Sequence, residues 1–432
     1  MDTWIHHRNR NRCSKIANSK RKCKREREDR AETKVTLGLQ DTSIIWHRVR
    51  YCRHNLYPKI SWVKDNPTRA PTAKELQSAM EEVSSYRFLS SGLNIIKDPL
   101  DQKSIIAIVE FTPFSQLTPS EKDDLNFVST FLHQTKPFIS PVRSSSRVWG
   151  GLMWALGWRK SYTEDQICGR YIKKIDLSQI SAFNSHYQKS PRLGQIIGSL
   201  FKNLARLPFQ KNQDIMKKYN IPSFADLSYG ELPEDSICSP HITFTTDSFF
   251  NPPHKDSDDI SEYAFVLWLP TLSSDGSLTD SPDYDITSGP FIFPDHKIGI
   301  DFDQTPGIVK MIWQANKYRH CTMPHSPSEN FTRLGMSVQI NSSLTATCDR
   351  INKGFYTDVK SYFASHFYYL FDCLKRFSID PSTFSLFVVF LFFLFFLFFD
   401  PNRFVLSSFS LSLTLVSLHL ATTQKFNHVL CS

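Results

Sequence analysis

From about residue 240 onwards, short β-rich runs follow one another with turn residues between them, and this pattern limits the possible folds most strongly. The clearest run covers residues 333–340, where side chains alternate between two faces as they do in a strand with two different environments. Leu334, Met336, Val338 and Ile340 fall on one face, and Arg333, Gly335, Ser337 and Gln339 fall on the other. A strand with one aliphatic and one polar face predicts a barrel wall that lines a polar pocket.

The remaining runs of this region lie at residues 241–246, 263–269, 291–293, 298–302 and 307–313. Antiparallel strands at such spacing favour a sandwich or small barrel of the jelly-roll type. The first half of the chain instead predicts helices, because capping boxes occur at Thr72–Glu75 and Thr118–Glu121 and residues 199–207 are amphipathic. We therefore expect an α+β fold, with a β core at about 240–345 and helices packed outside it.

Positive charge is concentrated at the N-terminus. Residues 1–34 contain 12 Lys or Arg against 5 Asp or Glu, within a formal net charge of +9 for the whole chain. Residues 1–60 are basic and poor in aromatic side chains, so we expect a mostly disordered leader. Such a segment can attract nucleic acid through counterion release. Its run Lys20–Arg25 matches a nuclear address as well as it matches a plain solvated leader.

Cysteine usage points to the cellular compartment. Nine Cys residues occur without a close CxxC pair, which argues against a disulfide framework and against a zinc ribbon. Met1 is followed by polar and basic residues rather than an apolar run, so no signal peptide is expected. These features predict an intracellular protein, which would not use the glycosylation sequons at Asn330 and Asn341.

The C-terminal part is unusual. Residues 384–399 are apolar except for Ser385, and nine of them are Phe. The stretch is somewhat shorter than the roughly 20 residues that span a bilayer. We predict a helical extension at 351–380 and then, at 381–432, a hydrophobic tail that is either translated non-coding sequence or a membrane anchor. The predicted location is therefore intracellular, nuclear if the basic address is used, and membrane-anchored if the tail is genuine.

The triplet His254-Lys255-Asp256 is the first candidate metal-binding motif. Side chains two residues apart on an extended segment point the same way, so this His and this Asp can bind one metal ion. Such a triplet also arises by chance, but His320 follows the strand predicted at 307–313 and can supply a third ligand. Two imidazoles and one carboxylate form the facial triad of non-haem Fe(II) enzymes, which leaves coordination positions open.

Other residues compete for these roles. The distal ligand could instead be His325, although the prolines on either side of it predict a loop. The carboxylate could instead come from Asp258 or Asp259, but their spacing from the first histidine is more typical of solvated loop acids. Two further histidines are expected to be structural, namely His241 and His296.

Arg333 follows the metal motif, and Ser337 shares its strand face. A guanidinium group binds a carboxylate through two parallel hydrogen bonds, and a nearby hydroxyl adds another donor. A dicarboxylate that chelates iron at its keto-acid end would need this kind of clamp at its other end. Taken alone, Arg333 would more often be a surface residue paired with an acid, but its position after the metal motif favours binding of a co-substrate.

The order of these segments resembles a known family. The resemblance is carried by 251–259 and 263–268, which include the HxD triplet, and by 153–162, 288–294, 306–313, His320-Cys-Thr322 and 332–339. Over roughly residues 85–350 they resemble the Tet-like 2-oxoglutarate/Fe(II) oxygenase domains. Two departures concern the site: Pro290 stands where the family commonly has a second glycine, and some relatives lack an Arg at the position of Arg333.

The resemblance implies a double-stranded β-helix of the cupin-like, jelly-roll kind, with Fe(II) at His254, Asp256 and His320 and 2-oxoglutarate at Arg333. It also implies oxidation of the methyl group of a 5-methylpyrimidine base, which would be flipped out of a nucleic acid duplex. Two alternatives stay open: a dioxygenase that acts on protein or a small molecule, and a non-catalytic DNA-binding module derived from a mobile element. The complete set of candidate ligands counts against the second alternative.

Overall fold

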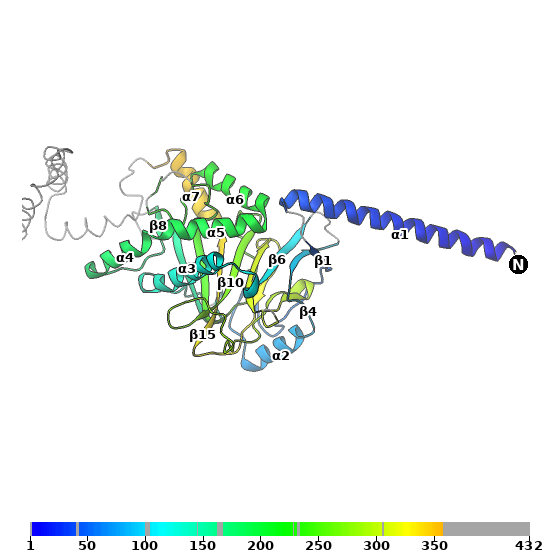
Figure 1. The fold of residues 1–432 in the computed structure, drawn as a ribbon, viewed down its shortest axis with the longest axis horizontal. Helices are drawn as coiled ribbons and strands as arrows, with labels where there is room; N and C mark the ends of the chain where they lie inside the picture. Colours follow the sequence, from blue (N-terminus) through cyan, green and yellow to red (C-terminus); the bar gives the residue numbers. More distant parts are fainter. Residues whose placement is uncertain are drawn as a thin grey trace, which may run out of the picture. The chain divides into compact units, whose positions relative to one another are not determined.

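The computed structural model describes residues 2–39, 43–99, 104–144, 146–161, 167–227, 229–230, 234–304 and 306–356. Over these residues the protein is a mixed, sheet-rich structure with helices packed outside the strands (Figure 1). The hydrophobic tail expected at 381–432, and nearly all of the helical extension expected at 351–380, lie outside the described residues.

The helices come mainly from the first half of the chain. The described α-helices are α1 (Asp2–Leu37), α2 (Ala73–Val83), α3 (Pro119–Thr135), α4 (Ile180–Tyr187), α5 (Ser190–Leu204), α6 (Arg206–Tyr219) and α7 (Ser342–Asn352). Short 3-10 turns are η1 (Phe114–Gln116), η2 (Lys136–Phe138), η3 (Leu177–Gln179) and η4 (Pro294–His296). The amphipathic segment expected at 199–207 is split between α5 and α6, because Ala205 adopts an extended conformation with φ −158° and ψ 96°.

The strands are concentrated in the second half. They are β1 (Ile44–Arg48), β2 (Trp62–Val63), β3 (Asn66–Pro67), β4 (Arg87–Leu89), β5 (Leu93–Lys97), β6 (Ile105–Pro113), β7 (Gly150–Lys160), β8 (Cys168–Arg170), β9 (His241–Phe250), β10 (Ala264–Leu272), β11 (Phe291–Phe293), β12 (Ile298–Ile300), β13 (Gly307–Trp313), β14 (Cys321–Thr322) and β15 (Phe331–Gln339). Each run predicted after residue 240 therefore corresponds to a strand.

Two helix starts are fixed by their local sequence. Thr72 Oγ1 accepts a hydrogen bond from the N–H of Glu75, and the Glu75 carboxylate accepts one from the N–H of Thr72. Thr118 and Glu121 make the same reciprocal pair at the start of α3. Such a capping box satisfies N–H groups that the first helical turn leaves without partners. Both predicted capping boxes are confirmed.

The strands form two main sheets. The large sheet has nine strands in the order β1-β5-β6-β13-β10-β15-β9-β7-β8, and the small sheet has four in the order β14-β11-β12-β4. Neighbours are antiparallel except for β1 with β5 and β12 with β4. A two-stranded sheet of β2 and β3 lies apart from both.

Both faces of the large sheet are buried, as β10 illustrates. Phe265, Leu267 and Leu269 lie in a core cluster that also contains apolar side chains of α3, α5 and α6. Val266 and Trp268 point to the opposite face and share a second cluster with strands β11 and β12 of the small sheet. The large sheet is therefore covered by helices on one face and by the small sheet on the other, and the site described below opens from the second face.

The alternation predicted for residues 333–340 is confirmed in β15. Leu334, Met336 and Val338 are buried in the helix-covered cluster. Arg333 and Ser337 have the opposite parity and point to the face that carries Val266 and Trp268, as the register between β10 and β15 requires. One strand thus contributes apolar side chains to the core and polar side chains to the site.

The N-terminal segment is not the disordered leader that its composition predicted. Residues 2–37 form helix α1, and its last turns are anchored to the large sheet. Leu37 is 1% exposed, and Asp29 pairs with the buried Lys97 of β5 at 2.6 Å. Glu26 pairs with Arg48 of β1, also at 2.6 Å. These contacts depend on individual residues of the segment, which an average over its composition does not describe.

The predicted location also requires correction. Among the residues described above, no helix is long and apolar enough to cross a membrane. The apolar stretch at 384–399, on which the anchor was predicted, lies outside the described part of the chain. The expectation of an intracellular, nuclear or membrane-anchored location therefore has no basis in the structure.

Candidate metal centre

His254 and His320 are brought together by backbone pairing. His254 follows β9, His320 directly precedes β14, and the two form an isolated antiparallel bridge. The N–H of His254 donates to the carbonyl of His320 at 3.0 Å, and the reverse bond is 2.9 Å long. Asn251 extends the pairing, since its Oδ1 accepts from the N–H of Thr322 at 2.8 Å. Residues far apart in the sequence are thereby held opposite each other.

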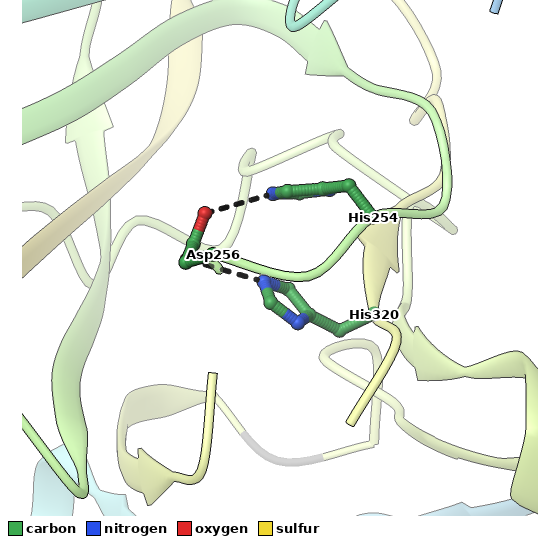
Figure 2. A group of neighbouring side chains, drawn as sticks. All are labelled: His254, Asp256 and His320. Atoms are coloured by element: carbon green, nitrogen blue, oxygen red, sulfur yellow. Dashed lines mark ion pairs between the residues drawn. The ribbon is translucent and has the colours of Figure 1, made fainter. Parts of the chain in front are cut away.

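Asp256 completes the group. Its N–H donates to the carbonyl of Ala315 at 3.0 Å, which ties its segment to the loop after β13. Asp256 Oδ1 lies 3.4 Å from His254 Nε2, and Oδ2 lies 3.6 Å from His320 Nε2. Figure 2 shows the carboxylate facing both imidazole rings. One ligand atom of each residue lies within 4.8 Å of the others, so all three can reach one metal ion.

The hydrogen bonds of the two rings favour metal binding through Nε2. His254 Nδ1 lies 2.9 Å from the carbonyl oxygen of Pro252, and His320 Nδ1 lies 3.0 Å from that of Tyr318. A carbonyl oxygen can only accept, so each Nδ1 carries the proton. In the neutral ring, each Nε2 then carries the lone pair that a metal ion can bind, which is how metal-binding histidines are commonly prepared.

Burial and neighbouring charges together set the pKa of each of the three groups. Burial alone would raise the pKa of Asp256, but hydrogen bonds and charge from both histidines outweigh it and hold that pKa well below its usual range. Burial lowers the pKa of His320, and His254 lowers it further. Burial also acts to lower the pKa of His254, but Asp256 outweighs it and the pKa is raised. At neutral pH the carboxylate is ionised and His320 is neutral, as metal ligands must be.

The group is closed on one side and open on the other. The side chain of His320 is 3% exposed, whereas those of His254 and Asp256 are 27% and 24% exposed. Phe291 stacks on His320 with 5.5 Å between ring centroids, and Trp313 meets it edge-on at 5.4 Å. His320 therefore lies at the buried bottom of the site. A ligand would approach from the side of His254 and Asp256.

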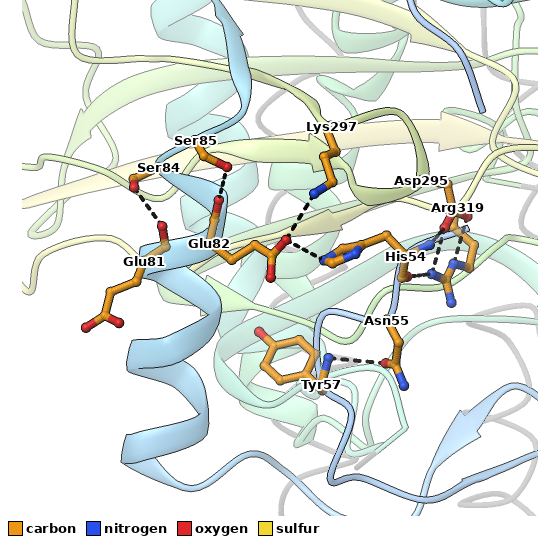
Figure 3. Close-up of polar contacts among 10 residues, drawn as sticks. All are labelled: His54, Asn55, Tyr57, Glu81, Glu82, Ser84, Ser85, Asp295, Lys297 and Arg319. Atoms are coloured by element: carbon orange, nitrogen blue, oxygen red, sulfur yellow. Dashed lines mark hydrogen bonds and ion pairs between the residues drawn. The ribbon is translucent and has the colours of Figure 1, made fainter. Parts of the chain in front are cut away.

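A bidentate salt bridge restrains the segment that carries the distal histidine. Arg319 donates to both oxygens of Asp295, at 3.0 Å from Nε and 2.9 Å from Nη2, and Nη2 also donates to the carbonyl of His54 (Figure 3). Glu82 of α2 lies 3.1 Å from His54 Nε2 and 3.2 Å from Lys297 Nζ. Two parallel charged bonds fix orientation as well as distance. Helix α2 and the turn η4 are thereby joined to the segment that leads into β14.

Arg333 is buried beside a turn of the chain. Its Nη1 donates to the carbonyls of Ser288 and Gly289 at 2.7 and 3.2 Å, and its Nη2 lies 3.6 Å from Asp303. The guanidinium carbon lies 4.4 Å from the ring centroid of Phe302. The side chain is only 7% exposed. Arg333 is therefore paired with an acid, but it is buried, unlike the surface arginine that would be the more common role of an isolated Arg.

The turn that receives Arg333 requires a glycine. Ser288 and Gly289 both have positive φ, at 66° and 68°. A Cβ added to Gly289 would lie 2.5 Å from the Cβ of His325 and 3.1 Å from Arg333 Nη1, so the turn leaves no room for a side chain there. The carbonyl of Pro290, the next residue, accepts from the N–H of Met323 at 2.9 Å.

Aromatic side chains connect Arg333 with the distal histidine. Phe302, which packs on the guanidinium, lies 5.1 Å from Trp268, and Trp268 lies 5.4 Å from Phe291. Phe291 in turn stacks on His320. These contacts form a continuous apolar wall from the candidate clamp to the candidate metal ligands.

Ser337 already has a partner in the structure. Its Oγ lies 2.7 Å from Oγ1 of Thr243 on β9. Only one of the two hydroxyls can donate in this bond, so the other keeps a proton for a ligand. The sequence prediction missed Thr243, because no local pattern shows that β9 pairs with β15.

His325 and His296 lie outside the metal-binding group. Among the described residues, only His254, Asp256 and His320 form a cluster of three groups that could hold a metal ion. His325 instead lies beside the glycine turn, with its Nδ1 2.6 Å from the carbonyl of Ser326. His296 is buried and lies 3.4 Å from Asp98, in keeping with a structural role.

The matched family agrees with the resemblance seen in the sequence. The model of the Tet-like 2OG-Fe(II) oxygenase superfamily matches residues 118–325. This segment is similar to the Tet-like 2OG-Fe(II) oxygenase domains. The protein is accordingly an oxygenase of the 2-oxoglutarate-dependent class, with Fe(II) and 2-oxoglutarate as its cofactors. The matched segment includes all three candidate iron ligands and ends before Arg333.

The oxygenase also has weak structural likenesses. One solved structure is titled NgTET1 in complex with 5mC DNA; it is 11% identical, with 73% of this chain and 89% of that chain covered and a TM-score of 0.36. A Pseudomonas putida prolyl-4-hydroxylase is 14% identical, with 55% and 95% covered and a TM-score of 0.26. OsALKBH1 is 11% identical, with 54% and 96% covered and a TM-score of 0.26. No curated protein matches the chain.

The donor set fits the iron that this family uses. Two imidazole Nε2 atoms and one ionised carboxylate converge, and the side of His254 and Asp256 is open to further ligands. This is the composition of the facial triad of non-haem Fe(II) oxygenases. The buried guanidinium of Arg333 likewise suits the carboxylate of 2-oxoglutarate.

Proposed function

We propose that His254, Asp256 and His320 bind the Fe(II) of this oxygenase, and that Arg333 binds the far carboxylate of 2-oxoglutarate. The convergence of three ligand atoms within 4.8 Å carries the first assignment. The second is supported by the burial of Arg333 and by the aromatic wall that links it to His320. Ser337, through its bond to Thr243, would supply an additional hydroxyl donor on the same strand face as Arg333.

We also propose that the two sheets form a double-stranded β-helix. Apolar side chains from both sheets share one cluster, which would be the interior of such a jelly roll. The metal-ligand segments support this arrangement, because His254 leaves β9 of the large sheet and His320 enters β14 of the small sheet. The candidate site would then lie at the open end of the barrel, a common position for ligand sites.

The protein's own groups would hold and orient the reactants. Bound Fe(II), with 2-oxoglutarate and dioxygen, supplies the oxidising power for hydroxylation of a C–H bond. The Nδ1 bonds to Pro252 and Tyr318 keep both rings in the tautomer that binds through Nε2. Asp256 contributes a fixed negative charge, and Phe291 excludes water from the side of the distal histidine.

We propose a methylated base in nucleic acid as the substrate; the NgTET1 structure is titled as a complex with 5mC DNA. Support within this chain comes from exposed cations on segments that adjoin the site. They are Arg143, Arg147, Lys160, Lys173, Lys174 and Lys255. Arg147 lies close enough to act electrostatically on His254, and Lys255 stands between two candidate iron ligands. A basic rim of this kind is typical of surfaces that bind phosphate backbones.

Helix α1 would add to this attraction. Its acidic residues Glu26 and Asp29 are engaged with the large sheet, so the Lys and Arg residues between 20 and 27 remain exposed. We propose that they contact nucleic acid outside the active site. The resulting affinity would fall steeply with salt concentration.

Succinate formation from 2-oxoglutarate tests the proposed site. The full chain is loaded anaerobically with Fe(II) and assayed with and without a DNA duplex that contains 5-methylcytosine, beside a His254→Ala variant. We expect iron-dependent succinate from the wild type and almost none from the variant, with stimulation by methylated DNA. Folded wild-type protein that retains no iron would refute the ligand assignment. Iron-dependent turnover without any stimulation by methylated DNA would refute the substrate.

A further inference from the structure

The inward face of β9 and β15 is polar or small-sided where the two strands pair. The opposed pairs on this face are Gly335 with Thr245, Ser337 with Thr243, and Gln339 with His241. Directly opposed residues of antiparallel strands point to the same face. Elsewhere the same sheet face is filled by the apolar cluster shared with the small sheet. His241 therefore belongs to the wall that also carries Arg333, although its sequence context predicted a structural histidine.

The two ends of this wall lie beside different parts of the site. Arg333 and Gln339 are six residues apart in β15, which corresponds to roughly 20 Å in an extended strand. Just beyond Gln339, the carbonyl of Ile340 accepts from the N–H of Ile260 at 2.9 Å. Ile260 lies on the segment that begins with the ligand Asp256. The His241 end of the wall thus lies on the metal side, opposite the end occupied by the co-substrate clamp.

His241 offers hydrogen-bonding groups for a ligand there. Its side chain makes no hydrogen bond to another residue in the described part of the chain, and it remains 8% exposed. The ring of Tyr171 meets it edge-on at 6.3 Å. Gly157 faces it across the strand pair, where a Cβ would come within 2.9 Å of the His241 Cα, so the backbone is fixed by close approach. The ring nitrogens of His241 are therefore available for hydrogen bonds to a ligand.

The ring is neutral at physiological pH. Burial lowers the pKa of His241 to about 4, and the positive charge of Arg147 acts in the same direction against a smaller effect of Asp256. A neutral imidazole offers one donor and one acceptor. The polar edge of a nucleobase presents donors and acceptors to match, whereas an aliphatic substrate does not.

We infer that His241 binds the substrate of the oxygenase, by a hydrogen bond to the polar edge of the base whose methyl group is oxidised. This assignment rests on the function proposed above. His241 would orient the base without touching iron or 2-oxoglutarate. Its loss should therefore affect substrate use and leave the co-substrate reaction intact.

The test compares His241→Phe, which keeps an aromatic ring beside Tyr171, with His241→Gln, which keeps a donor and an acceptor. His186→Phe serves as the matched control, because His186 is also a buried histidine with a lowered pKa, and it lies in α4, packed against α3. Full-length proteins loaded with Fe(II) are assayed on a duplex containing 5-methylcytosine. Both the oxidised base and succinate are quantified, with and without DNA.

We expect His241→Phe to raise the KM for methylated DNA about tenfold, the effect of one lost hydrogen bond. In His241→Phe the ratio of oxidised base to succinate should fall. The amount of succinate formed without DNA should stay at the wild-type level. His241→Gln should recover part of the loss, and His186→Phe should show neither change. A wild-type KM and coupling ratio in His241→Phe would overturn the assignment, as would an equal loss of DNA-independent succinate. If the wild-type protein forms succinate but methylated DNA does not stimulate it, both the proposed substrate and the assignment of His241 are refuted. If the wild-type protein forms no iron-dependent succinate at all, the proposed metal site itself is refuted.

Discussion

Replacing Arg333 with lysine tests the co-substrate clamp most directly. Lysine keeps the positive charge near Asp303 but loses the planar fork that can bind a carboxylate through two parallel bonds. Hydrogen bonds to charged groups contribute roughly 1.5–3 kcal/mol each. With one of them lost, the KM for 2-oxoglutarate should rise about 10- to 100-fold. The bonds of Nη1 to Ser288 and Gly289 are lost as well, so a stability decrease of about 1–2 kcal/mol should accompany the change.

The assay measures succinate at increasing 2-oxoglutarate concentrations with iron-loaded protein, and urea unfolding reports stability. Arg170→Lys is the matched control, because Arg170 is also a buried arginine that packs on an aromatic ring, with its guanidinium carbon 5.0 Å from the centroid of Tyr187. The Arg170→Lys protein should be less stable than the wild type but keep the wild-type KM for 2-oxoglutarate. Iron binding should be unchanged in both variants, since neither residue is a candidate ligand. An Arg333→Lys protein that is folded and iron-loaded and has a wild-type KM for 2-oxoglutarate would refute the clamp.

Three further predictions concern stability. Burial, together with Lys189, lowers the pKa of His186 to about 4, so the stability provided by its neutral ring is complete above about pH 6.5 and is lost as the pH falls towards 4. In urea titrations the wild type should lose about 2 kcal/mol more than His186→Gln between pH 7 and pH 5, and equal losses would contradict this reasoning. Thr118→Ala removes the capping box of α3 and should cost about 1 kcal/mol in the same measurement, so an unchanged midpoint would count against the cap. Asp29→Ala deprives the buried Lys97 of its carboxylate and should cost about 1–3 kcal/mol, with partial recovery in the double variant that also carries Lys97→Met; full stability of the single variant would show that α1 does not dock as described.

Much of the strand pattern was encoded locally. The two-residue alternation in β15 predicted which side chains would enter the core, because each face of a strand meets one environment. The capping boxes at Thr72 and Thr118 predicted helix starts for a similar reason, since their bonds span only three residues. The N-terminal helix could not be predicted from such local patterns. Its order depends on contacts of Asp29 and Leu37 with distant strands, which an average over composition does not contain.

Some features of the candidate site are likewise specified by local sequence, and others depend on tertiary contacts. The sequence by itself determined the residue types that can bind iron and the spacing of His254 and Asp256, because both lie on one short segment. It left open whether His320 or His325 would join them, and it indicated nothing about the partners of Arg333, Ser337 and His241. Only the tertiary structure decided these points. Reciprocal bonds between the backbones of His254 and His320, and the pairing of β15 with β9, join segments that are distant in the chain, and no local pattern specifies such contacts.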